Sequence, residues 1–124
     1  MTAATCLVAD DHPALRAAIE SYLDEAGYDV VAAVPDGPRA VSAAAELRPE
    51  AAVVDLRMPR LDGVPLVHAL RDASPGTRVI VYTAEIDGPT AEALLGAGAV
   101  GVVLKEAPLA DLGRALEAAL RGSV

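Results

Sequence analysis

Aromatic residues, cysteine and basic residues are scarce in this chain of 124 residues. It has no Trp and no Phe, one Cys, and ten Lys and Arg against eighteen Asp and Glu, which gives a formal net charge of −8. Affinity for phosphate backbones comes largely from basic residues, so direct binding to nucleic acid or to an anionic membrane is not expected of this domain. A cationic ligand or a protein partner fits the charge better.

Long apolar runs are also missing. No stretch is long enough to span a membrane, and no basic residue precedes the first apolar segment, so membrane insertion and secretion are both disfavoured. The lone Cys6 lies in an apolar, strand-like run, which favours a reduced, cytoplasmic setting in which it packs as a small hydrophobe. Hydrophobic residues make up 53% of the chain and charged residues 23%. We therefore expect residues 1–124 to form one packed domain in the cytoplasm.

Strand-like and helix-like segments alternate five times. Short apolar runs predict strands at residues 5–9, 29–34, 51–55, 78–83 and 100–104. Apolar residues at helical spacing predict helices from Pro13 to just before Gly27, at residues 40–47, 64–70 and 89–97, and from near Pro108 onward. Such alternation predicts an α/β fold, a doubly wound, flavodoxin-like sheet of five parallel strands in the order 2-1-3-4-5 with five helices.

Chemically active residues follow the strands at their carboxyl ends. They are Asp10 and Asp11 after the first strand, Asp55 at the end of the third, Thr83 at the end of the fourth and Lys105 after the fifth. The carboxyl ends of parallel strands share one edge of the sheet, where the ligands of such folds bind. Two carboxylates about 4 Å apart repel by about 4 kcal/mol at an effective dielectric near 20, so this group needs a cation. Oxygen ligands alone favour Mg²⁺.

Each of these residues also has an ordinary structural explanation. An acidic doublet before a helix often caps it, an Asp after a strand often belongs to a turn, and Thr83 or Lys105 alone would be a surface residue. Only their combination at one edge favours a functional site. His12 and His68 receive little weight, because neither has a second His or Cys at ligand spacing, and His12 fits the start of a helix.

The whole set resembles the response regulator receiver domain, the phosphoacceptor module of two-component signalling. The matching residues are the pair Asp10-Asp11, Asp55 with Met58-Pro59 and Asp62-Gly63 behind it, Thr83-Ala84, and Lys105. The stretches Asp10-Asp-His-Pro13 and Lys105-Glu-Ala-Pro108 are similar to receivers of the NarL/FixJ type, which a DNA-binding output domain usually follows. We expect residues 1–124 to be the receiver alone, without that output domain.

The resemblance implies a role for each matching residue. Asp55 would accept a phosphoryl group from a sensor histidine kinase, while Asp10, Asp11, Asp55 and the backbone carbonyl of Arg57 would hold Mg²⁺. Lys105 and Thr83 would contact the phosphoryl oxygens. The resemblance also implies an output in transcription regulation and a homodimer as one possible assembly. The domain would assist its own phosphorylation and dephosphorylation without being an enzyme in the ordinary sense.

Two positions depart from the family pattern. Val102 stands where the family commonly has Tyr or Phe, three residues before the Lys, so a switch that turns an aromatic ring inward is absent. Glu106 stands where many members have a cis Pro, and a cis bond before a non-proline residue costs about 2.5–4 kcal/mol. Arg57 and Glu85 each lie two residues beyond a matching residue, and we predict that they set the lifetime of the phosphoryl group.

Two other functions compete with this one. The first is a receiver-like interaction module that does not switch by phosphorylation. Val102 is the reason to keep this alternative, because it replaces the usual switch aromatic. The second is an enzyme on the same fold, either a flavin-binding protein or a phosphatase with an aspartate nucleophile. It ranks last, because no Gly-rich or Ser/Thr-rich phosphate loop follows the first strand and the acidic doublet would repel a flavin phosphate.

Overall fold

The computed structural model of the protein describes residues 3–121. Within that range the chain forms one sheet of five parallel strands in the order β2-β1-β3-β4-β5, which confirms the predicted topology. The strands are β1 (Thr5–Ala9), β2 (Asp29–Val34), β3 (Ala51–Asp55), β4 (Arg78–Thr83) and β5 (Gly101–Leu104).

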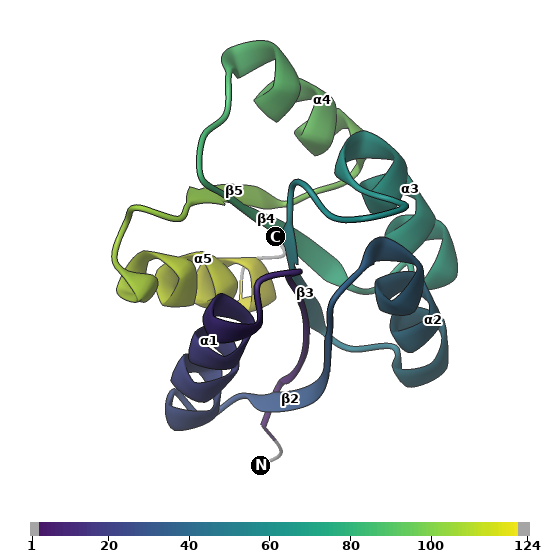
Figure 1. Cartoon of the computed structure of the whole chain (residues 1–124). Helices are drawn as coiled ribbons and strands as arrows, with labels where there is room; N and C mark the ends of the chain where they lie inside the picture. The colour runs from purple at the N-terminus through teal and green to yellow at the C-terminus, as the bar shows by residue number, and fades with distance from the viewer. Residues whose placement is uncertain (1–2, 122–124) are drawn as a thin grey trace.

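Helices cover both faces of the sheet (Figure 1). They are α1 (Pro13–Glu25), α2 (Gly37–Leu47), α3 (Gly63–Ala73), α4 (Gly88–Ala97) and α5 (Leu109–Arg121). The core beneath α1 and α5 includes Ile19, Leu23, Leu112 and Leu116. The core on the other face, beneath α2, α3 and α4, includes Ala44, Leu66, Leu70 and Leu94. The large apolar residues of the first and last helices therefore lie in the core.

The three inner strands are the most deeply buried. Every residue of β3 is buried, as are all residues of β1 and β4 except the first of each, whereas most residues of the edge strands β2 and β5 are partly exposed. This is the pattern expected for strands covered by helices on both faces. Tyr82 packs into the core beneath α5. As predicted from side-chain alternation, it lies on the other face of the strand from Thr83, which lines the cavity at the carboxyl edge.

Helix α2 begins three residues earlier than predicted. The side chain of Asp36 accepts a hydrogen bond from the backbone N–H of Arg39 at 2.9 Å and so caps the first turn. The sequence Pro35-Asp-Gly-Pro38 had indicated a turn, but Pro38 lies in the first helical turn, where its missing N–H has no intrahelical partner to lose.

Short connections bring four strand ends to one edge of the sheet, here called the carboxyl edge. In the strand register Ala9 lies opposite Val54, Asp55 lies opposite Tyr82, and Thr83 lies opposite Leu104. No helix within residues 3–121 combines the length and the apolar character needed to cross a membrane. No peptide bond in the same range is cis, so the bond between Lys105 and Glu106 is trans.

Candidate functional site

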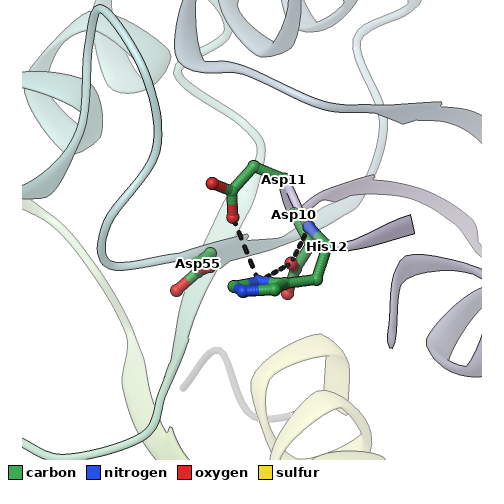
Figure 2. A group of neighbouring side chains, drawn as sticks. All are labelled: Asp10, Asp11, His12 and Asp55. Carbon is green, nitrogen blue, oxygen red and sulfur yellow. Dashed lines mark hydrogen bonds and ion pairs between the residues drawn. The ribbon is translucent and has the colours of Figure 1, made fainter. Parts of the chain in front are cut away.

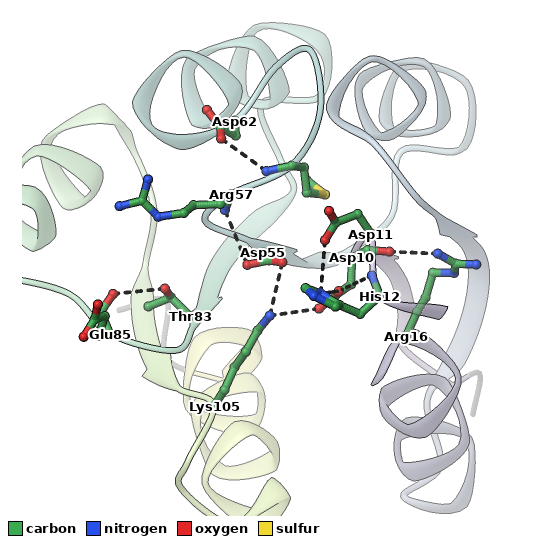
Figure 3. Close-up of polar contacts among 11 residues, drawn as sticks. Asp10, Asp11, His12, Arg16, Asp55, Arg57, Asp62, Thr83, Glu85 and Lys105 are labelled. Carbon is green, nitrogen blue, oxygen red and sulfur yellow. Dashed lines mark hydrogen bonds and ion pairs between the residues drawn. The ribbon is translucent and has the colours of Figure 1, made fainter. Parts of the chain in front are cut away.

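The predicted site residues converge on a cavity of about 300 Å³ at the carboxyl edge. Its lining includes Asp11, Asp55, Arg57, Thr83 and Lys105. Asp10 lies beside them, almost wholly buried, and contacts Lys105 (Figure 3). Side chains from four strand ends, separated by up to 95 residues in the sequence, therefore meet in one place.

Three carboxyl groups form the centre of the site, and we call Asp10, Asp11 and Asp55 the acidic cluster. Figure 2 shows the three together with His12, and one donor atom from each of these four residues lies within 4.8 Å of the others. Asp10 and Asp55 are buried, while Asp11 is partly exposed. Like charges at such distances repel strongly in a partly desolvated site, so the cluster is stable only with nearby cations.

Lys105 supplies one of these cations. Its Nζ atom lies 3.1 Å from Oδ2 of Asp55 and 3.3 Å from Oδ2 of Asp10. Burial by itself would lower the pKa of Lys105, but its hydrogen bonds and charge interactions with Asp55 and Asp10 outweigh this and raise the pKa above its ordinary value. Lys105 therefore stays protonated. Its backbone N–H also donates to the carbonyl of Thr83 at 2.7 Å, which ties the ends of β4 and β5 together.

Asp55 is held in an unfavourable environment for a carboxylate. Burial raises the pKa of its carboxyl group above the ordinary value, Lys105 opposes this, and the charge of Asp10 adds to it. The backbone N–H of Arg57 donates to Oδ1 of Asp55 at 3.4 Å. The carboxyl group thus faces the cavity with one oxygen toward Lys105 and the other toward the loop after β3.

The loop after β3 is fixed by local contacts. Oδ2 of Asp62 accepts the backbone N–H of Met58 at 3.2 Å, which closes the loop on itself. Arg60 has a φ of 71°, in the left-handed region, and its guanidinium lies 3.7 Å from the Asp36 carboxylate. A Cβ at Gly37 would collide with the backbone of Leu61, so only glycine allows α2 to approach the loop so closely.

Thr83 lines the cavity together with Asp55. Its hydroxyl donates to the carbonyl of Glu85 at 3.1 Å. Glu85 lines the same cavity and, with Arg57, a second one of about 270 Å³ between the loops after β3 and β4. Both residues therefore flank the acidic cluster, as their positions in the sequence predicted.

The donor set fits a divalent cation. Within the described residues, the buried Oδ2 of Asp10 has only Lys105 as a polar partner, at 3.3 Å, and the buried Oδ1 of Asp11 has only Nδ1 of His12, at 3.1 Å. The three carboxylates and Lys105 together carry a net charge of about −2, which a divalent ion balances. A carboxylate oxygen can accept more than one partner, so these two oxygens have lone pairs left for a cation. Oxygen donors suit Mg²⁺, which keeps several of its waters.

His12 lies both at the start of a helix and beside the candidate site. It does start α1, as predicted, because it is the N-cap residue. Its ring, however, lies against the acidic cluster, with Nδ1 3.2 Å from Oδ1 of Asp10 and 3.1 Å from Oδ1 of Asp11. Arg16 was missed altogether: its guanidinium donates to the backbone carbonyl of Asp10 at 2.8 Å. Since Arg16 follows His12 by four residues, helical spacing could have placed it at the same end of α1.

Comparison with a known family model covers most of the chain. Residues 6–117 match the model described as the response regulator receiver domain. The transcriptional regulatory protein PrrA of Mycobacterium tuberculosis is 39% identical over 121 residues, which cover 98% of this chain and 52% of that protein. The response regulator GacA of Pseudomonas viridiflava is 32% identical over 117 residues, with 94% and 55% covered. The chain thus spans about half the length of the curated relatives it matches.

Solved structures share the fold over nearly the whole chain. The signal receiver domain of NarL from Mycobacterium tuberculosis aligns with a TM-score of 0.92 at 28% identity, covering 98% of this chain and 99% of that one. The isolated receiver domain of RcsB from Salmonella enterica serovar Typhimurium, solved in the presence of the phosphomimetic BeF₃⁻, aligns with a TM-score of 0.88 at 27% identity. That alignment covers 98% of this chain and 91% of the RcsB chain.

Proposed function

Because the chain belongs to the response regulator receiver family, we propose that Asp55 accepts a phosphoryl group from a sensor histidine kinase in a reaction that depends on Mg²⁺. The observation that carries the proposal is the position of Asp55. Its carboxyl group faces a cavity of about 300 Å³, has Lys105 at 3.1 Å, and lies beside two further carboxylates.

The transfer itself needs little covalent chemistry from the protein. A carboxylate oxygen of Asp55 attacks the phosphorus, a P–O bond forms, and the P–N bond of the phosphohistidine breaks with its electrons remaining on the imidazole. Charge accumulates on the equatorial phosphoryl oxygens, so catalysis is mostly positioning and charge neutralisation. Attack by water on the same phosphorus would later return the carboxylate and release inorganic phosphate.

Each neighbouring residue has a part in this reaction. Asp10, Asp11, Asp55 and the backbone carbonyl of Arg57 would hold Mg²⁺, which when bound neutralises charge on the phosphoryl and carboxylate oxygens. Lys105 would pair with another phosphoryl oxygen as a compact positive charge. The domain would thereby assist its own phosphorylation and dephosphorylation as a signalling module.

The output would begin at Thr83. Its hydroxyl donates to the carbonyl of Glu85 and, within residues 3–121, to no other group, so it can exchange that acceptor for a phosphoryl oxygen. Because the Lys105 N–H is bonded to the Thr83 carbonyl, movement of one loop would move the other. Relatives of this chain are transcriptional regulators, so we expect the switch to control transcription through a separate DNA-binding domain, with homodimerisation as one route.

The compartment that we propose for this reaction is the cytoplasm, where a thiol stays reduced. Cys6 is a free, buried thiol, and burial raises its pKa to about 12, so it stays a packing residue. A receiver exchanges its phosphoryl group with the kinase domain of its partner, and we expect that exchange to occur in the cytoplasm.

Phosphorylation by a small donor tests the proposal directly. Wild type, Asp55→Asn and Asp72→Asn are incubated with Mg²⁺ and acetyl phosphate and then weighed by intact mass spectrometry. Asp72 is an exposed carboxylate of α3 and serves as the matched control. Wild type and Asp72→Asn should each gain one phosphoryl group, and Asp55→Asn should gain none. An adduct of equal yield on Asp55→Asn would refute the assignment.

One observation favours the interaction module as a second candidate. Val102 packs against the core beneath α4 in place of a switch aromatic, so the movement of a large ring is absent. Under this alternative, wild type would gain no phosphoryl group in the same experiment.

A further inference from the structure

His12 has no part in the function proposed above, yet its ring contacts two carboxylates of the acidic cluster. Its Nδ1 atom faces Oδ1 of Asp10 and Oδ1 of Asp11 at 3.2 Å and 3.1 Å (Figure 2). Lys105 contacts the opposite oxygen of Asp10, Oδ2. Lys105 and His12 therefore contact different oxygens of Asp10 and do not compete for the same atom.

The ring is within hydrogen-bond distance of both carboxylates, and the same distances also suit donor atoms that share one metal ion. Neighbouring ligands on an octahedral ion with bonds of about 2.1 Å are about 3.0 Å apart. Neighbouring ligands on a tetrahedral zinc ion are about 3.3–3.4 Å apart. The separations between Nδ1 and the two carboxylate oxygens fall between these values. The side chain of His12 is 70% exposed, so an ion arriving from solvent can reach it, whereas that of Asp10 is 2% exposed.

A second observation points to a ligand at the same place. Oδ1 of Asp11 is buried and, within the described residues, has no polar partner other than Nδ1 of His12 at 3.1 Å, so it has lone pairs left for a metal ion that the ring would share. Oxygen and nitrogen donors side by side change which ions a site prefers. Carboxylates and water suit Mg²⁺, whereas imidazole suits zinc and other late transition metals.

We propose that His12 is a nitrogen ligand of the metal site and shifts its preference from Mg²⁺ toward zinc-like divalent ions. The inference rests on the proposed function, because it concerns the same cation site. It predicts that this receiver binds Zn²⁺ through Nδ1 of His12 together with Asp10 and Asp11, and that Mg²⁺ binds mainly through the carboxylates.

Metal titrations of matched variants test the inference. The binding of Zn²⁺ and of Mg²⁺ to wild type, His12→Ala and His68→Ala is measured by calorimetry in a non-coordinating buffer at neutral pH. His68 is the chain's only other histidine and lies exposed on α3. His12→Ala should weaken Zn²⁺ binding by about ten-fold or more and Mg²⁺ binding far less. His68→Ala should alter neither. A ratio of Zn²⁺ to Mg²⁺ affinity that is the same in His12→Ala and wild type would overturn the proposal.

A spectroscopic measurement on the unaltered protein makes the test independent of any variant. With two histidines in the chain, nitrogen-15 spectra of the imidazole rings resolve each one. Stoichiometric Zn²⁺ should shift the Nδ1 resonance of His12 and leave that of His68 in place, and Mg²⁺ should shift neither strongly. Zn²⁺ that leaves both rings unshifted would contradict the proposal.

The experiments distinguish a wrong assignment of His12 from a wrong assignment of the function. If wild type neither binds Mg²⁺ nor gains a phosphoryl group from acetyl phosphate, the proposed function is wrong. If it does both, and the zinc preference is independent of His12, only the role of His12 is wrong.

Discussion

The two edges of the sheet are built from the same strands and have opposite characters. At the amino edge, the hydroxyl of Thr77 donates to the carbonyl of Pro49 at 2.6 Å and lies 2.7 Å from the hydroxyl of Ser74. Both hydroxyl groups are buried, neutral and fully paired. At the carboxyl edge, Asp10 and Asp55 are buried acids that share one cation, Lys105.

The difference shows how stability and function are divided within one fold. Paired neutral groups at the amino edge hold the connections before β3 and β4 in place. The carboxyl edge keeps three clustered carboxylates and a carboxyl group whose pKa is raised by burial, which costs stability and leaves the site ready for a cation and a phosphoryl group.

Loss of one carboxylate at the carboxyl edge should have the largest effect. Asp11→Asn removes one charge from the cation site, and we expect Mg²⁺ affinity to fall by about ten-fold or more, since ligand charge sets the affinity of such sites. Calorimetric titration with Mg²⁺ measures this. Thr77→Val at the amino edge is the control and should bind Mg²⁺ like wild type. Equal Mg²⁺ affinities in Asp11→Asn and wild type would mean that the charge at the carboxyl edge does not bind the cation.

Thr77→Val should instead change stability. The substitution keeps the shape of the side chain but leaves the Pro49 carbonyl and the Ser74 hydroxyl without their partner, at a cost of about 1–3 kcal/mol in the free energy of unfolding. Denaturation in urea measures the change. An unfolding free energy equal to that of wild type would mean that the amino edge does not depend on this pairing.

Asp55→Asn should move stability in the other direction. The pKa of Asp55 is raised in the folded protein, so the folded state binds the proton more tightly than the unfolded state does, and the ionised form is destabilising. That cost is absent below the unfolded pKa of about 3.9 and is complete above the raised folded pKa. The variant should therefore melt a few degrees higher than wild type at neutral pH without Mg²⁺, with the advantage shrinking as the pH falls toward the unfolded value. A lower melting temperature at neutral pH would contradict this.

The flanking residues of the carboxyl edge should have the smallest effects. Arg57 and Glu85 line the cavity beside Asp55, so truncating either to Ala should change how easily water reaches the phosphoryl group. We expect several-fold changes in the rate of dephosphorylation, measured by loss of the phosphoryl adduct over time. Ala substitution of exposed Asp72 is the control, and unchanged rates in both flanking variants would refute the idea.

Much of the fold was predictable because its signals are local. Burial on both faces made β3 a continuous apolar run, and Gly and Pro marked the turns that separate it from its neighbours. The start of α2 was predicted three residues too late because Pro38 fits both a turn and a first helical turn. The capping hydrogen bond to the Asp36 side chain decides between the two, and it is seen only in the structure.

The candidate site was predictable as far as topology determines it. Parallel strands carry the residues after their carboxyl ends to one edge, so Asp10, Asp55 and Lys105 could be grouped from the sequence. Helical spacing places Arg16 at the same end of α1 as His12, but the orientation of the His12 ring depends on how α1 packs against the sheet, which spacing does not encode. For that reason the ligand proposed beyond the family pattern emerged only from the structure.

The central claim is that Asp55, alone among the carboxylates of this chain, accepts a phosphoryl group when Mg²⁺ is present. Borohydride reduction of the acyl phosphate, after treatment with acetyl phosphate and Mg²⁺, converts the modified aspartate to homoserine, which peptide mass mapping locates. The account predicts homoserine at position 55 and its loss when Mg²⁺ is removed by a chelator. Homoserine at another aspartate, or at position 55 regardless of Mg²⁺, would contradict it.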